Sequence, residues 1–150
     1  MKLGEFKGWL VLGDAHFKEQ YDLLHAAVER KKLKDPERFD SSNVAKRYRM
    51  VTLLISEIVA AEPSAIQFRL GKTLRSEYKH WRRAKFFQQY RLFFRYDSKS
   101  KIIIFSWFND EETKRAYESK DDAYLVFEKM LDSGNSPNNW IELLDETKTQ

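Results

Sequence analysis

The sequence contains no cysteine, and it has only three prolines and five glycines among its 150 residues. The absence of thiols excludes disulfide bonds, cysteine nucleophiles and cysteine-ligated zinc, and it is typical of proteins from a reducing cytoplasm. No apolar run approaches the ~20 residues that cross a bilayer, and the N-terminal segment lacks the apolar core and cleavage site of a signal peptide. We therefore expect a soluble, cytoplasmic protein with no membrane contact.

Several motifs that would carry a cofactor are also missing. The sequence has no HExxH motif, no His/Asp cluster with metal-ligand spacing, no glycine-rich phosphate loop and no G-x-S-x-G elbow. A zinc, nucleotide-binding or acyl-transfer enzyme is therefore not supported, and we expect neither a metal nor another cofactor.

The composition predicts one folded domain. Hydrophobic residues make up 42% of the chain and aromatic residues 15%, which is enough to bury a core at this length. We find no repeat, no low-complexity tract and no linker. We therefore predict a single domain over residues 1–150, with a frayed tail at 146–150.

Helical periodicity dominates the first half of the chain. Apolar residues 9–12 predict a first strand, and Asp14 stands where the N-cap of a helix would stand. Apolar side chains then recur at helical spacing up to about Lys32, and again over 43–61. Pro63 ends this second helix, because the residue before a proline disfavours the helical conformation.

The second half begins with strands. Segments 81–87, 90–96 and 101–108 are rich in aromatic or β-branched residues and are separated by turn-like residues, which predicts an antiparallel meander. Segment 102–105 is apolar on both faces and is best placed centrally in the sheet.

Short helices are predicted at about 111–119, from Asp122 onward and within 136–145. The predicted fold class is therefore α+β, with two N-terminal helices packed on an antiparallel sheet. That sheet consists of the three-strand meander plus edge strands, and the short helices follow it.

Positive charge is concentrated in one segment. Residues 69–101 contain eleven basic and two acidic residues, a net charge of +9, whereas the rest of the chain carries −5. Such asymmetry is typical of a protein that binds a polyanion, most often nucleic acid. A merely solvated basic face is the alternative.

The middle strand concentrates part of this charge on one face. Its apolar residues Tyr90, Leu92, Phe94 and Tyr96 alternate with Arg91, Phe93 and Arg95. Because successive side chains of a strand point to opposite faces, one face is apolar and the other presents two guanidinium groups.

Three segments together resemble the YhaV family of toxins in the RelE superfamily. They are YRLFFRY (90–96), WFNDE (107–111) and DDAYLVFEKML (121–131), in this order and spacing. A Gly8-Trp9 start and a Pro137-x-x-Trp140 ending also fit, so the resemblance covers nearly the whole chain.

The resemblance implies a RelE-like fold and an endoribonuclease (mRNA interferase) that cuts messenger RNA in a ribosome-dependent manner and so halts translation. It also implies a PrlF-type, AbrB-like antitoxin as partner. The complex of the two would repress its own operon, so that operator DNA is contacted only through the antitoxin.

RNA can be cut without metal when its own 2′-hydroxyl attacks the adjacent phosphate. The protein must then accept the 2′ proton, stabilise the charge on the phosphate and protonate the leaving 5′ oxygen. Arginine and lysine suit the second task. Cations on strands about 4.8 Å apart can converge on one phosphate; the strand 90–96 offers Arg91 and Arg95, and its neighbour offers Arg82 or Arg83 and Lys85.

In RelE-type toxins an arginine of the Y-R-L strand is catalytic, and Arg91 matches it. Basic residues before that strand and a C-terminal tyrosine also contribute, with Tyr117 the nearest match by spacing and Tyr124 the second. The candidate catalytic residues are Arg91, Lys85, Arg83, Tyr117 and His80. The candidate RNA-binding residues are Lys72, Arg75, Lys79, Arg82, Arg95, Arg115 and Tyr124.

The sequence departs from RelE after the last strand. Where RelE has a cationic turn, this chain has Phe108-Asn109-Asp110. Either Arg115 replaces the missing cation, or Asp110 or Glu111 accepts the proton.

Histidine and the aromatic residues leave further alternatives. His80 could act as acid or base or stack on a base, or it could simply be an exposed loop residue. Four aromatics next to the cations could stack on single-stranded RNA or belong to the core; they are Trp81, Phe86, Phe87 and Phe93. Tyr90, Phe94, Phe105 and Trp107 are expected in the core.

Two other functions compete with the nuclease. The protein could block translation by occupying RNA or the ribosome without cutting, or it could be only a structural partner of a DNA-bound antitoxin. The sequence does not distinguish the general base, the preferred codons or the toxin:antitoxin ratio.

Overall fold

The computed structural model describes residues 1–71, 73–109 and 122–148. Five strands form one sheet in the order β1-β2-β5-β4-β3. The strands are β1 (Lys2–Phe6), β2 (Trp9–Gly13), β3 (Arg82–Phe86), β4 (Tyr90–Asp97) and β5 (Ile102–Phe108). The meander β3-β4-β5 and the central place of β5 are as predicted.

The sheet is mixed, which corrects the prediction of an antiparallel sheet. β2 pairs with β5 in parallel, whereas the other three pairs are antiparallel. A parallel pair needs a long crossover connection, and here α1 (Ala15–Lys34) and α2 (Asn43–Leu53) lie in that connection.

A strand that the sequence analysis missed precedes β2. β1 and β2 are joined by a two-residue turn in which Lys7 and Gly8 both have positive φ, 51° and 85°. Positive φ at both central positions matches the right-handed twist of the flanking strands. The hairpin therefore extends the sheet by one edge strand.

Both predicted N-terminal helices are present. Asp14 caps α1 as expected, since its carboxylate accepts a hydrogen bond from the Phe17 N–H at 2.9 Å. Helical structure also spans 43–61, with a π-helical turn η2 (Leu54–Ile58) between α2 and the short α3 (Val59–Ala61).

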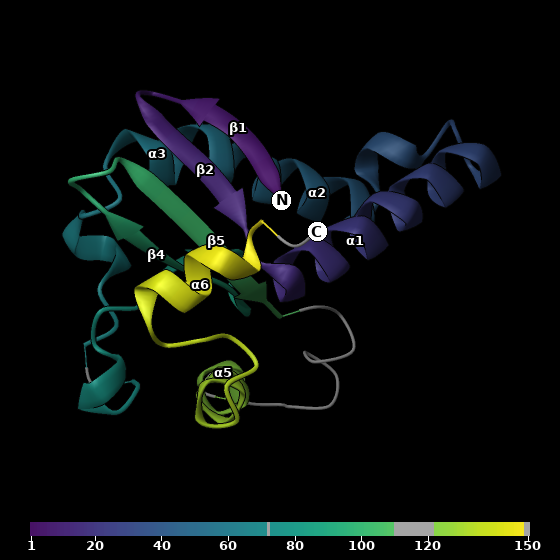
Figure 1. The fold of residues 1–150 in the computed structure, drawn as a ribbon. Helices are drawn as coiled ribbons and strands as arrows, with labels where there is room; N and C mark the ends of the chain where they lie inside the picture. Colours follow the sequence, from purple (N-terminus) through teal and green to yellow (C-terminus); the bar gives the residue numbers. More distant parts are fainter. Residues whose placement is uncertain (72, 110–121, 149–150) are drawn as a thin grey trace.

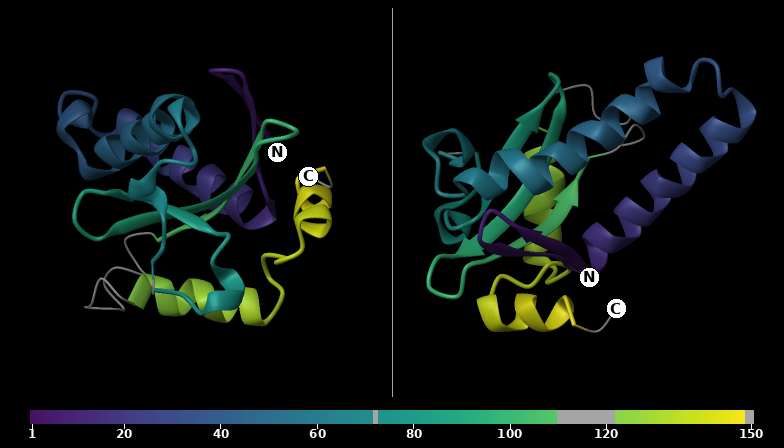
Figure 2. Two further views of the ribbon diagram at one scale, coloured as in Figure 1. Left: turned by 90° about the vertical axis from the view of Figure 1, so that its left-hand side faces the viewer. Right: turned by 90° about the horizontal axis from the view of Figure 1, so that it is seen from above.

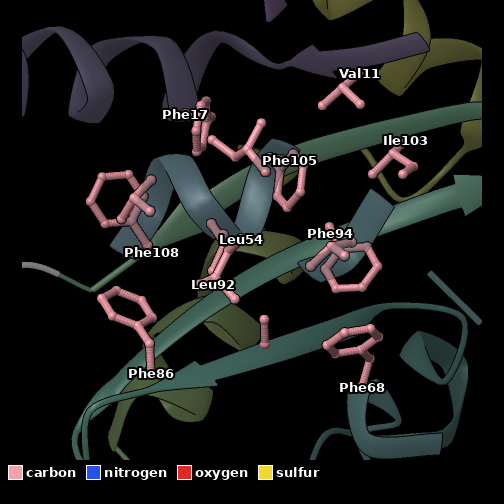
Figure 3. Close-up of a cluster of buried hydrophobic side chains, with 14 of the residues drawn as sticks. Val11, Phe17, Leu54, Phe68, Phe86, Leu92, Phe94, Ile103, Phe105 and Phe108 are labelled. Carbon is pink, nitrogen blue, oxygen red and sulfur yellow. The ribbon is translucent and has the colours of Figure 1, made fainter. Parts of the chain in front are cut away.

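The sheet is covered on both faces (Figures 1 and 2). On one face, the long helices α1 and α2 bury an apolar cluster against the strands, which includes Phe17, Leu54 and Phe94 (Figure 3). On the other face, α5 (Asp122–Asp132) and α6 (Trp140–Glu146) form a second cluster around Phe93 and Phe127. None of the described helices is long and apolar enough to cross a membrane.

Candidate functional site

Three of the candidate cations lie on the same face of the sheet. In the β3–β4 pair, Lys85 is opposite Arg91, and Arg83 is opposite Phe93. Directly opposed residues of neighbouring antiparallel strands project from one face, as do alternate residues of a strand. Arg83, Lys85 and Arg91 therefore share the face that α5 covers, which confirms that the meander brings these cations together.

The two arginines converge on one oxygen atom. Arg83 Nε donates a hydrogen bond to the Tyr124 hydroxyl at 2.9 Å, and Arg91 Nε donates to the same hydroxyl at 3.1 Å. We call these three residues the Arg83–Tyr124–Arg91 cluster. Tyr124 was the second choice for the C-terminal tyrosine, and α5 places it directly over the arginines.

Backbone carbonyls satisfy much of the remaining hydrogen-bonding capacity of these arginines. Arg83 Nη1 donates to the carbonyls of Gln67 and Arg69, at 3.2 and 2.5 Å. Arg91 Nη1 donates to the carbonyls of Gln88 and Tyr90, at 3.2 and 2.9 Å. Within the described part of the chain, neither arginine forms an ion pair with a carboxylate. Two positive charges are therefore held together without an acidic counter-charge from these residues.

The arginines are buried, which corrects the prediction that the strand presents them on an exposed face. Arg91 is 4% exposed and Arg83 is 9% exposed, because α5 packs over this part of the sheet. Lys85, in contrast, is exposed. The site thus has a covered cationic centre and one cation at its open edge.

Aromatic stacking holds α5 in this position. The Phe127 ring of α5 stacks on Phe93 of β4, with centroids 4.2 Å apart and planes 14° from parallel, and it also stacks on Trp107 of β5. Tyr124 meets Phe93 edge-on. Trp81, Phe86 and Phe93, which the sequence left open as stacking platforms for RNA, belong to the core, and only Phe87 is exposed.

Asn109 is a positioning residue that the sequence analysis missed. Its Oδ1 accepts from the Arg91 N–H at 2.6 Å, and its Nδ2 donates to the Gln89 carbonyl at 2.7 Å. The side chain is buried, and it joins the end of β5 to the start of β4. The sequence feature that could have identified Asn109 is its place as a polar residue directly after an apolar strand, in the segment that departs from RelE.

Three other predicted RNA-binding cations are engaged in packing or ion pairs. The Arg95 guanidinium lies between the rings of Trp81 and Trp140, and Nη1 donates to the Asn138 carbonyl. Burial lowers the pKa of Arg95 to about 10. Arg82 stacks on Tyr96, and Arg75 pairs with acidic residues of α5, including Glu128. Of the remaining candidates, Lys79 is exposed.

His80 is not part of the Arg83–Tyr124–Arg91 cluster. Its Nε2 shares a hydrogen bond of 2.7 Å with Asn138 Oδ1, which also accepts from Trp81 Nε1. Partial burial, followed by the nearby Arg95 charge, lowers the pKa of His80 below its usual value. The structure therefore places His80 in a packing contact between the segment that precedes β3 and the segment that precedes α6.

Lys72, Arg115 and Tyr117 lie outside the described residues, as do Asp110 and Glu111 and the predicted helix 111–119. In the described ranges, no group of three or more His, Asp or Glu side chains is arranged to hold a metal ion.

Comparison with known proteins agrees with the family resemblance. Residues 11–148 match the Toxin_YhaV family, described as a toxin with endonuclease activity, of toxin-antitoxin system. The chain is 46% identical over 143 residues to "Toxin YhaV" of Escherichia coli O6:H1 and to "Ribonuclease toxin YhaV" of Escherichia coli strain K12. The alignment covers 94% of this chain and 93% of each relative. No solved structure matches the chain. On this evidence the chain belongs to the YhaV family of toxins, which have endonuclease activity and act within toxin–antitoxin systems.

Proposed function

We propose that this toxin is an endoribonuclease that cuts messenger RNA at the Arg83–Tyr124–Arg91 cluster. The observation that carries the proposal is the convergence of two guanidinium groups from neighbouring strands on one oxygen atom. Arginine donors held in this way match the oxygen atoms of a phosphate. The name of the 46% identical Escherichia coli relative, a ribonuclease toxin, supports RNA as the substrate.

In the proposed reaction the RNA supplies its own nucleophile and no metal takes part. The 2′ oxygen loses its proton and attacks the adjacent phosphorus, and the bond from phosphorus to the 5′ oxygen breaks. The products are a 2′,3′-cyclic phosphate and a 5′-hydroxyl end. Arg83 and Arg91 stabilise the charge that develops on the phosphate oxygens. Of the described residues around this phosphate, the exposed Lys85 can exchange a proton beside it.

RNA reaches the arginines only after Tyr124 leaves them, because both guanidinium groups are buried beneath α5. The phosphate oxygen then replaces the tyrosine oxygen as the shared acceptor. A buried pair of like charges with few counter-charges favours an incoming anion. We infer that the structure represents the closed form of the site and that substrate binding displaces at least the Tyr124 end of α5.

The biological setting follows the family resemblance. We propose that cleavage takes place in the cytoplasm on messenger RNA engaged by the ribosome, within a single RelE-like domain. We also propose that a PrlF-type antitoxin, with an AbrB-like DNA-binding fold, inhibits the toxin and that the complex represses its operon through the antitoxin. Lys79, Lys85 and the other exposed cations would guide RNA toward the site by long-range attraction.

The decisive experiment maps RNA ends in cells after a short induction of the toxin. The wild-type protein is expected to create new 5′ ends that carry a hydroxyl and new 3′ ends that carry a cyclic phosphate. Arg91→Ala should abolish these ends and restore growth while circular dichroism shows a folded protein. Arg91→Lys tests whether any cation suffices, and it should remain strongly impaired, because a single ammonium cannot replace the guanidinium donors.

Lys99→Ala is the matched control, since it removes one basic residue of the same charged segment. Lys99 is exposed in the turn beyond the far end of β4, and the strand from Arg91 to Asp97 alone spans about 20 Å at ~3.3 Å per residue. This variant should cut as the wild type does. New ends with a 5′-phosphate would contradict the proposed chemistry. Translation arrest without any new ends would favour the alternative, in which the toxin blocks RNA or the ribosome by occupancy.

A further inference from the structure

The β3–β4 turn carries an exposed aromatic side chain beside the proposed site. Phe87 is 55% exposed, whereas Phe86 and Tyr90 on either side of the turn are buried. The Phe86 and Tyr90 rings stack on each other with centroids 5.1 Å apart, and Phe87 meets both of them edge-on. One side of Phe87 thus packs on the Phe86 and Tyr90 rings, while much of its surface faces solvent.

The backbone holds Phe87 in a conformation that a phenylalanine rarely adopts. Its φ is 49°, in the left-handed region, where a side chain with a Cβ is disfavoured and glycine or asparagine is usual. Residues kept in such conformations cluster at functional sites. More than half of the Phe87 surface remains exposed to solvent, so packing alone does not account for an aromatic residue in this position.

The proposed catalytic arginine and its positioning residue fix this turn. Arg91 Nη1 donates to the Gln88 carbonyl, and Asn109 Nδ2 donates to the Gln89 carbonyl. Asn109 also accepts from the Arg91 backbone N–H. The position of the turn is therefore coupled directly to the position of Arg91.

The chemistry of the turn suits one unpaired nucleobase. Phe87, Gln88, Gln89 and Tyr90 line a shallow hollow that is open to solvent. The hollow offers an aromatic surface for stacking and two amides that can both donate and accept hydrogen bonds. The exposed Lys85 precedes Phe87 by two residues and supplies positive charge for the adjoining phosphate.

We propose that the β3–β4 turn is a nucleobase subsite, in which Phe87 stacks on a base next to the phosphate that is cut and Gln88 and Gln89 contact its edge. This inference rests on the proposed ribonuclease function. It adds a contact that can select among bases, which the cationic cluster alone cannot do, since phosphates carry no sequence information.

The test compares Phe87→Gly and Phe87→Trp with the wild type. Glycine relieves the left-handed backbone and removes the ring, so Phe87→Gly should fold with an unchanged or higher Tm. Its affinity for a single-stranded 2′-O-methyl RNA, which cannot be cut, should fall roughly tenfold, as expected for the loss of one stacked base. Phe87→Trp keeps an aromatic surface and should retain the affinity. Leu33→Ala, which removes another exposed apolar side chain near the end of α1, is the control.

A set of RNAs with one abasic position each identifies the stacked base. The wild type should lose about tenfold in affinity for one member of the set, and Phe87→Gly should not distinguish that member from the intact RNA. In cells, Phe87→Gly should weaken the base preference around the mapped cut positions. An unchanged affinity and an unchanged base preference would overturn the subsite, while the ribonuclease proposal would stand if Arg91→Ala still abolished cutting. A wild-type protein that neither binds nor cuts RNA would overturn both.

Discussion

Arg83 and Arg91 occupy neighbouring strands and donate to the same tyrosine hydroxyl, with Nε to oxygen distances of 2.9 and 3.1 Å. In the proposed mechanism, stability and activity therefore depend on the same atoms. The arginines need an oxygen acceptor in the closed form, and the proposed reaction needs that acceptor to be exchanged for a phosphate. The first two predictions follow from this exchange.

Arg83→Lys should destabilise the protein by about 1–3 kcal/mol, because lysine cannot replace all the hydrogen bonds to Tyr124, Gln67 and Arg69 from one nitrogen. Urea denaturation measures the change. Arg75→Lys is the matched control for stability. The Arg75 side chain is 48% exposed, and exposed ion pairs contribute about 0–1 kcal/mol. Equal losses in the two variants would contradict the buried role of Arg83.

Tyr124→Phe should also lower the free energy of unfolding, again by about 1–3 kcal/mol, because it leaves two buried Nε–H groups without their acceptor. The loss should be accompanied by faster amide hydrogen exchange in α5. Tyr96→Phe, which removes the hydroxyl of a half-buried tyrosine of β4, provides the comparison. If the Tyr124 variant were as stable as the wild type and α5 exchanged no faster, the hydroxyl would not hold the helix.

Asp14 should make stability depend on pH. Burial raises the pKa of this carboxyl from 3.8 to about 6, although it accepts hydrogen bonds from the Phe17 N–H and the Ser136 hydroxyl. The folded state therefore binds the proton more tightly than the unfolded state does. The resulting stabilisation is fully present below pH 3.8 and is lost as the pH rises through about 6.

Asp14→Asn isolates this effect, since asparagine is an equally good N-cap and does not ionise. From pH 4 to pH 7 the wild type should lose stability relative to Asp14→Asn, by about 2 kcal/mol. Urea denaturation of both proteins at several pH values measures the difference. A wild type that instead gained stability relative to the variant would show that Asp14 is not desolvated.

Asn138→Ala should destabilise the protein by about 1–3 kcal/mol at the contact between the segments that precede β3 and α6, because the Asn138 Oδ1 accepts hydrogen bonds from both His80 and Trp81. Asn138→Asp keeps the acceptor and adds a negative charge. This second variant should raise the pKa of His80 above its wild-type value, which an NMR titration of the imidazole would detect. An unchanged His80 titration would place Asn138 outside contact distance in solution.

The local elements were predictable because their signals are local. The alternation in Tyr90–Tyr96 identified β4 and assigned Arg91 to the face opposite Leu92, and Asp14 marked the start of α1. The Lys7-Gly8 turn was missed because Lys-Gly is a weaker hairpin signal than Asn-Gly. The parallel pairing of β2 with β5 joins segments about ninety residues apart, and periodicity does not report such pairing.

The packing of α5 over Arg83 and Arg91 was not predictable for a similar reason. The apolar stripe of α5, which includes Phe127, identified a helix with a buried side, but a stripe does not specify which surface buries it. Phe93 offered the matching surface, and its position between Arg91 and Arg95 favoured an exposed strand face in the sequence. Only the packing of α5 on the sheet resolves which of these residues reach solvent.

The two apolar clusters hold β4 from both faces of the sheet. Leu92 and Phe94 of this strand are anchored in one cluster and Phe93 in the other, and all three are fully buried. The strand that bears Arg91 is consequently a stationary scaffold, whereas α5 touches the sheet through one face alone. An inhibitor that acts by changing the conformation of the toxin would therefore be most effective if it bound α5. Natural sequence variation in the toxin should be better tolerated on the outer surface of α5 than anywhere along β4.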